Sequence, residues 1–119
     1  MSQTMQQIII TEPGGVDKLA YETVATPSPA NNEVLVKVHA FGLNRPDILQ
    51  RQGLYPMPKG VTPVPGLEVA GIVEAVGTEV TAFKVGDKVC GLTNGGGYAE
   101  YCVVPESQTL AMPEGVSFI

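Results

Sequence analysis

A two-residue periodicity of apolar side chains is the feature that most constrains the fold of this chain. It is clearest from Glu33 to Phe41, where the apolar positions are Val34, Val36, Val38 and Ala40. Lys37 and His39 fall on the alternate positions. Successive side chains of a β-strand point to opposite faces, so the pattern predicts a strand with one buried face.

The rest of the sequence predicts more short strands and very little helix. Strands are expected at Met5–Thr11, Val69–Val76, Asp87–Leu92 and Tyr98–Val104, each bounded by turn-forming residues. Fourteen glycines and ten prolines supply many turns. Helical character is confined to Arg45–Gln52, with Pro46 in its first turn and Gly53 at its end. The pattern predicts a mainly β domain built as a small barrel with one short helix.

Length and charge exclude several classes of protein. A chain of 119 residues suits one domain, expected over residues 1–119, with its own core. A net charge of −5 with seven scattered Lys and Arg argues against nucleic-acid binding. No apolar run approaches the roughly 18 residues of a membrane span, and the first residues lack the pattern of a secretion signal. We therefore expect a cytoplasmic protein without a membrane partner.

The metal-binding side chains are too few for a structural zinc site. The chain has two cysteines, Cys90 and Cys102, without a C-x-x-C pair, and one histidine, His39, on the polar face of its strand. A Cys-His-Glu site that includes Glu68 is conceivable, yet no spacing brings these residues together. Free core thiols are expected, although a disulfide is possible if the two cysteine strands pair.

The run Gly95-Gly96-Gly97 has a functional and a structural interpretation. A dinucleotide fingerprint requires G-x-G-x-x-G between a strand and a helix, whereas this run leads into a predicted strand. We therefore interpret it as a flexible hairpin loop.

The segment from Asn44 to Tyr55 carries the polar side chains best suited to chemistry. Asn44 supplies amide donors and an acceptor, and Tyr55 supplies a hydroxyl with an ordinary pKa of about 10. Structural roles are also available, because Asn44 can cap the helix and Tyr55 can pack beside Pro56 and Pro58. The spacing of Asp47 and Arg51 favours an exposed ion pair on the helix.

Two motifs in combination resemble a known family. They are Asn-x-x-Asp-x-x-x-Arg-x-Gly-x-Tyr over residues 44–55 and Gly-Leu-Glu-Val-Ala-Gly over residues 66–71. Together they resemble the catalytic domain of quinone oxidoreductases in the zinc-free, zeta-crystallin-like branch of the medium-chain dehydrogenase/reductase superfamily. Zinc-dependent members carry Cys at position 44 and His at position 67, where this chain has Asn44 and Leu67.

This resemblance implies a GroES-like, partly open β-barrel with one short helix, and no zinc. It implies NADPH as cofactor, bound mainly by a Rossmann domain that this chain lacks, a quinone-type substrate, and a homodimeric parent enzyme. Asn44 and Tyr55 would face the nicotinamide and the acceptor, with Asp47 as a weaker cofactor-side candidate. Tyr55 would stabilise charge developing on the quinone oxygen, Asn44 would position the cofactor, and Glu68 would be a structural hydrogen-bond or ion-pair partner.

Three alternatives share the fold. A zinc-type alcohol dehydrogenase domain is disfavoured by Asn44 and Leu67, whereas a non-zinc enoyl or alkenal reductase would share the hydride chemistry. A non-enzymatic co-chaperonin-like binding module would need a long loop with an aliphatic tip. The early loop, residues 26–32, is short and lacks such a tip.

Overall fold

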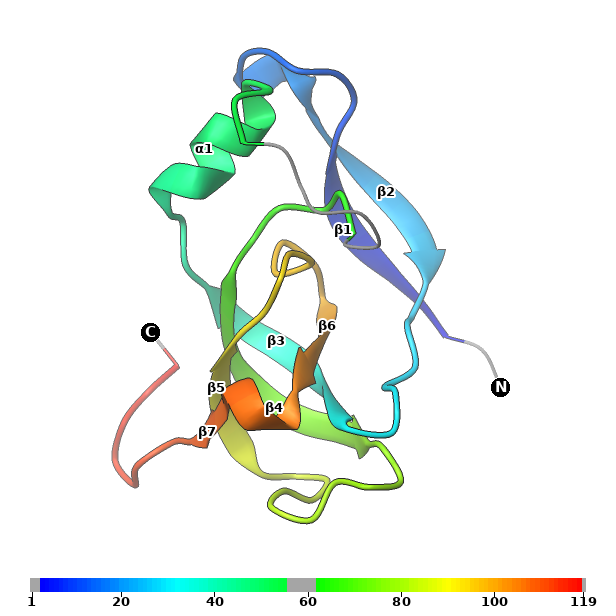
Figure 1. Cartoon of the computed structure of the whole chain (residues 1–119), viewed down its shortest axis with the longest axis vertical. Coiled ribbons are helices and arrows are strands. Elements are labelled where there is room, and N and C mark those ends of the chain that lie inside the picture. Colours follow the sequence, from blue (N-terminus) through cyan, green and yellow to red (C-terminus); the bar gives the residue numbers. More distant parts are fainter. Residues whose placement is uncertain (1–2, 56–61, 119) are drawn as a thin grey trace.

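Short β-strands dominate the computed structural model, which describes residues 3–55 and 62–118 (Figure 1). Within these residues one α-helix and two 3₁₀ turns accompany the strands. The elements in chain order are β1 (Thr4–Ile10), η1 (Val16–Lys18), β2 (Leu19–Ala25), β3 (Glu33–Phe41), α1 (Arg45–Arg51), β4 (Glu68–Val76), β5 (Lys88–Leu92), β6 (Tyr101–Pro105), η2 (Glu106–Gln108) and β7 (Thr109–Ala111). None of the helices in the described residues is long and apolar enough to cross a membrane.

The main sheet has five antiparallel strands in the order β6-β3-β4-β5-β7. Its inner face carries a valine-rich core that includes Val34 and Val36, as the alternation in β3 predicted. Leu35, which alternates to the opposite face, is buried as well, so the prediction of a single buried face holds only from Val36 onwards. Each fully buried valine stabilises the fold by roughly 1.5–3 kcal/mol relative to an exposed one. The buried core residues are Val34, Val36, Val69, Val73, Val89, Cys102 and Val104.

The hairpin of β1 and β2 extends the main sheet and curls it into a half-barrel. The link is the segment just before β6: Tyr98 O accepts the Ile8 N–H at 2.8 Å, and Gln6 O accepts the Glu100 N–H at 3.1 Å. On its other side, Glu100 O accepts the Val38 N–H at 2.8 Å. The partly open barrel with one short α-helix is therefore confirmed.

Several element bounds differ from the sequence prediction. Strands β2 and β7 were not predicted, because Leu19–Ala25 is largely exposed and three-residue β7 is too short for a periodic pattern. Strand β6 begins at Tyr101 rather than Tyr98, since residues 98–100 form only an isolated bridge to β1. Strand β4 begins one residue earlier than predicted, and β5 one residue later.

The triple glycine is not a hairpin loop, because β5 and β6 do not pair. Strand β5 lies between β4 and β7, whereas β6 lies on the far side of β3, so the connection crosses the sheet (Figure 1). The cysteine strands are therefore apart, and both thiols are free, with Cys102 buried and Cys90 half-buried.

The crossing connection is held against the segment before β4. The Gly96 N–H donates to Val64 O at 2.8 Å and the Tyr98 N–H to Pro65 O at 3.0 Å. At Gly66, where φ is +107°, a Cβ would lie 2.7 Å from Gly97 Cα. Two glycines thus permit a backbone approach that any side chain would prevent.

Helix α1 has the expected start and end. Asn44 occupies the N-cap with extended backbone, and Pro46 lies in the first turn. At the other end Gly53 takes a φ of +81°, and the Leu54 N–H donates to Leu49 O at 2.8 Å, as in a Schellman motif. The helix ends at Arg51, one residue earlier than predicted.

Candidate active site

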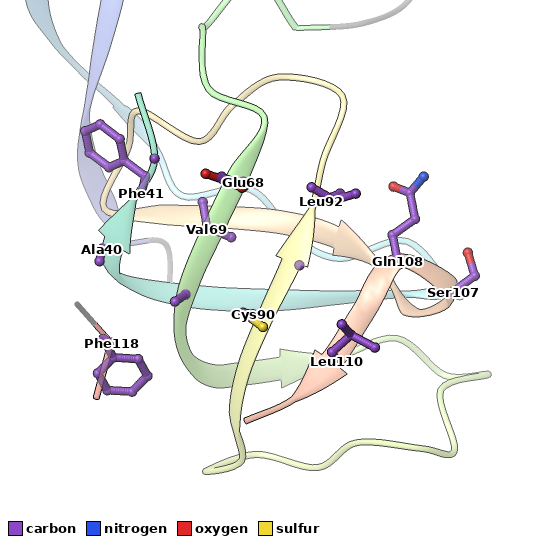
Figure 2. A pocket seen from close by; sticks show the side chains of 13 residues that line it. Ala40, Phe41, Glu68, Val69, Cys90, Leu92, Ser107, Gln108, Leu110 and Phe118 are labelled. Atoms are coloured by element: carbon purple, nitrogen blue, oxygen red, sulfur yellow. The ribbon is translucent and has the colours of Figure 1, made fainter. Parts of the chain in front are cut away.

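An open apolar cleft of about 670 Å³ lies where β3 ends and β4 begins (Figure 2). Its lining combines small residues with larger apolar side chains, and Glu68, Cys90, Ser107 and Gln108 add polar atoms. The lining residues are Ala40, Phe41, Gly42, Glu68, Val69, Ala70, Cys90, Gly91, Leu92, Ser107, Gln108, Leu110 and Phe118. Such a cleft suits a flat, largely apolar ligand.

Asn44 is connected to this cleft through the lining residue Glu68 and lies two residues beyond Gly42. Its side chain is half-buried, and its Nδ2 donates to Glu68 Oε1 at 3.3 Å. Glu68 is thereby confirmed as a hydrogen-bond partner within the site. The Glu68 bond uses one amide hydrogen, and the capping box of α1 pairs the side-chain oxygen with the Asp47 backbone N–H. The second amide hydrogen and one acceptor position of Asn44 are left for other partners.

Asp47 is buried, which contradicts the exposed ion pair predicted with Arg51. Only 5% of Asp47 is exposed, and its Oδ2 accepts the Asn44 backbone N–H at 3.1 Å. Arg51 instead donates from Nε to Gly14 O at 3.1 Å. Asp47 occupies the N3 position of α1, where a carboxylate closes a capping box and the helix dipole favours its charge.

Tyr98 completes this arrangement and was not predicted as a site residue. Its hydroxyl donates to Asp47 Oδ2 at 2.8 Å, and its ring stacks on Phe41 with centroids 4.6 Å apart. Burial, followed by the hydrogen bond and the charge of Asp47, raises the pKa of Tyr98 above its ordinary value. The hydroxyl therefore stays protonated and remains a donor.

The burial of Asp47 is incompletely compensated. Its Oδ1 is buried without a hydrogen-bond partner among the described residues, while Oδ2 serves two donors. Such an atom is costly unless a water molecule or ligand group reaches it. A cofactor group could supply this partner, but no contact tests it, so the expectation that Asp47 faces the cofactor stays a prediction.

Tyr55 lies beyond the opposite end of α1 from Asn44. It is 40% exposed and follows the glycine that ends the helix. Among the described residues no hydrogen bond joins Tyr55 to Asn44, and Tyr55 is not part of the cleft lining, so their convergence on one ligand is a prediction. The expected packing against Pro56 and Pro58 lies outside the described residues.

The potential metal ligands in the described part of the chain do not form a cluster. His39 is exposed, as expected, and its ring stacks on Phe118 with centroids 4.5 Å apart. Across residues 3–55 and 62–118 no three His, Cys, Asp or Glu side chains are placed to hold a metal ion. The absence of zinc stays a prediction that metal analysis can test.

The family model of the alcohol dehydrogenase GroES-like domain matches residues 30–114. The chain belongs to this family. The matched region includes the whole cleft lining except Phe118, the Asn44–Glu68 pair and the Tyr98–Asp47 pair, so the site lies in the part of the chain that carries the family pattern.

Curated relatives of this GroES-like domain include quinone oxidoreductases. The quinone oxidoreductase of Sus scrofa is 42% identical over 96% of this chain and 35% of its own length. The synaptic vesicle membrane protein VAT-1 homolog of Danio rerio is also 42% identical, over 97% of this chain and 24% of its own length. The chain thus spans about a quarter to a third of these relatives.

Solved structures agree with the same assignment. Escherichia coli quinone oxidoreductase complexed with NADPH matches with a TM-score of 0.88 and 33% identity over 95% of this chain and 35% of that one. CurK enoyl reductase matches with a TM-score of 0.85 and 32% identity, over 98% of this chain and 37% of that one. The GroES-like fold expected from the sequence is confirmed, as is the resemblance to quinone oxidoreductases.

Proposed function

We propose that this GroES-like domain is the catalytic domain of an NADPH-dependent quinone oxidoreductase that transfers hydride to quinones or related activated carbonyl compounds. The observation that carries the proposal is an apolar cleft whose lining residue Glu68 accepts a hydrogen bond from the amide of Asn44, at a position where a zinc enzyme would need a thiolate. The similarity to quinone oxidoreductases supports the same chemistry.

The residues present fit the nicotinamide end of NADPH. The cleft lining includes the small residues Ala40 and Ala70, and Asn44 retains an amide hydrogen and an acceptor position for a ribose or carboxamide group. The chain has no G-x-G-x-x-G turn for the pyrophosphate. We therefore propose that NADPH is bound mainly by a nucleotide-binding domain outside these 119 residues, and that the bound nicotinamide supplies the hydride.

The proposed role of Asn44 is to position the cofactor, and that of Tyr55 is to donate a hydrogen bond to the acceptor. A neutral hydroxyl stabilises an oxygen that gains negative charge more than it stabilises the uncharged quinone. Asp47 holds the backbone of Asn44 and stands behind it as a weaker cofactor-side candidate.

Tyr55→Phe in the complete oxidoreductase tests the donor role. Removal of the hydroxyl with the ring preserved should cost about 2–4 kcal/mol in the transition state, roughly a 10- to 1,000-fold loss of turnover. Tyr21→Phe is the matched control, because Tyr21 is 78% exposed on β2. Steady-state kinetics with a 1,4- and a 1,2-quinone provide the measurement, and unchanged turnover with both would eliminate the donor role.

Asn44→Ala should give a different kinetic signature. Loss of a cofactor-positioning group should raise the Michaelis constant for NADPH as well as slow turnover. Circular dichroism of each variant shows whether the fold is retained.

An enoyl or alkenal reductase is the second candidate function, favoured by the similarity to CurK enoyl reductase. It would use the same cleft and hydride donor on a conjugated double bond. Parallel assays of quinones, enones and enoyl thioesters separate the two, and metal analysis of chelator-washed protein tests the zinc-type alternative. We further propose that the parent enzyme is a homodimer and works in the cytoplasm, where thiols such as Cys90 and Cys102 stay reduced.

A further inference from the structure

Glu68 restricts the orientation of the Asn44 amide. The Glu68 side chain approaches from the start of β4, and its Oε1 lies 3.3 Å from Asn44 Nδ2. An ionised carboxylate has acceptors and no donors, so only the NH₂ group of Asn44 can face it. The opposite orientation would place two oxygens against each other. The carbonyl oxygen of Asn44 must therefore point away from Glu68, towards the first turn of α1, where the capping box pairs it with the Asp47 backbone N–H.

The Glu68 carboxylate can take this position only because residue 42 is a glycine. A Cβ on Gly42 would collide with Glu68 Oε1 and lie 2.7 Å from its Cδ. The Gly42 N–H also donates to the Glu68 backbone oxygen at 3.3 Å. Figure 2 shows Glu68 beside Phe41 at the cleft, so the carboxylate occupies space that Gly42 leaves free.

The backbone of Asn44 is fixed from another direction. Asp47 accepts its N–H at 3.1 Å, and Asp47 is bound in turn by the buried Tyr98 hydroxyl at 2.8 Å. The backbone of Asn44 is thus held by one carboxylate, while the two ends of its amide face Glu68 and the Asp47 N–H.

We propose that Glu68 is a positioning residue that, together with the capping box of α1, makes Asn44 present the remaining acceptor position of its carbonyl oxygen to a hydroxyl or amide donor of the nicotinamide riboside. This inference rests on the proposed function and assigns to Glu68 a part in cofactor binding beyond the structural hydrogen bond. It makes a distinctive prediction, because the negative charge of Glu68 by itself repels an anionic cofactor. A purely electrostatic role would make the loss of that charge improve NADPH binding, whereas a positioning role would make it weaken binding.

The test is Glu68→Gln in the complete oxidoreductase. Glutamine keeps the shape of the side chain but hydrogen bonds to either orientation of the Asn44 amide. The Michaelis constant for NADPH should rise about 2- to 12-fold, the range expected when one side chain is no longer immobilised, with kcat within about twofold of wild type. Glu74→Gln, an exposed acid on the same strand, is the matched control and should leave both constants unchanged.

Gly42→Ala provides an independent route to the same effect. Its Cβ should displace the Glu68 carboxylate without removing any charge, so the Michaelis constant for NADPH should rise as in Glu68→Gln. In an Asn44→Ala background, Glu68→Gln should cause no further rise, since Glu68 acts through Asn44. A lower or unchanged Michaelis constant in Glu68→Gln, or additive effects in the double variant, would overturn the proposal.

A measurement on the 119-residue chain separates this inference from the proposed function. Nuclear Overhauser effects should connect the Asn44 side-chain NH₂ protons to the Glu68 methylene protons, and they should disappear in Gly42→Ala. Their absence from the wild-type chain would overturn the positioning role. Failure of the complete wild-type protein to bind NADPH, with these effects present, would instead refute the proposed function and with it the cofactor that Asn44 is inferred to contact.

Discussion

The Tyr98–Asp47 hydrogen bond shows how one residue pair connects two distant parts of the chain. The residues are 51 positions apart, and their contact joins the start of α1 to the connection that crosses the sheet. A buried carboxylate is tolerated only where donors satisfy it. Tyr98 therefore supports the orientation of Asn44 through Asp47.

Tyr98→Phe should destabilise the domain by about 1–3 kcal/mol, because it removes a donor from a buried carboxylate and leaves the ring packing on Phe41 intact. Urea unfolding followed by circular dichroism measures the loss. Tyr21→Phe on the exposed face of β2 should change the free energy of unfolding by less than about 0.5 kcal/mol. Equal stability of the two variants would mean that the bond contributes nothing.

Cys102 should make the free energy of unfolding decrease at alkaline pH. Burial is the main reason why the pKa of its thiol rises to about 11. A hydrogen bond with Thr93 lowers this pKa, and the negative charge of Glu33 raises it. The unfolded thiol releases its proton near pH 9 and the folded one near 11, so its contribution is present below about pH 9 and is lost as pH rises towards 11.

The free energy of unfolding should therefore fall more steeply between pH 9 and 11 in wild type than in Cys102→Ala, by up to about 1.4 kcal/mol per pH unit. Urea unfolding across this range measures both slopes. Tyr98, whose pKa is also raised, affects both proteins alike, so parallel slopes would show that Cys102 does not contribute.

At the scale of elements, the crossing connection depends on glycine for two separate reasons. Gly66 needs a left-handed φ of +107° and also contacts Gly97 and Tyr98 closely, whereas Gly86 has a similar φ of +97° with open space around it. Substitutions at Gly66 and Gly86 can therefore distinguish the energetic cost of backbone strain from the cost of steric overlap.

Gly86→Ala should cost about 1–2 kcal/mol from strain alone. Gly66→Ala should cost about 1–3 kcal/mol more, because its Cβ would overlap backbone atoms that hold the connection against β4. Chemical unfolding of both variants measures the difference. Equal losses would show that the connection moves aside without cost.

For the whole molecule, folding and cofactor binding depend on different parts of the protein: folding depends on the hydrophobic core, and cofactor binding on a site for the pyrophosphate of NADPH. The valine core belongs to this chain, so the 119 residues should fold alone. Because they lack a pyrophosphate platform, they should bind NADPH only feebly and show no dehydrogenase activity. Calorimetry that found micromolar NADPH affinity for the 119-residue chain would contradict this expectation.

The sequence alone determined those features that depend on local pattern. Alternation predicted β3 and its buried face, and Asn44, Pro46 and Gly53 predicted where α1 begins and ends. These predictions are correct because strand alternation and helix capping depend on residues only a few positions apart. The motifs around Asn44 and Glu68 likewise indicated the family that the full comparison confirmed.

Only the tertiary structure decided which distant residues meet. It placed β5 and β6 on separate sides of the sheet, buried Asp47 against Tyr98, and brought Glu68 to Asn44. The sequence predicted a hairpin and an exposed Asp47–Arg51 pair instead, because spacing reports neighbours along the chain. The burial of Asp47 depends on a contact 51 residues away, and the strand order depends on pairings such as Glu33 with Pro105, which no local pattern encodes.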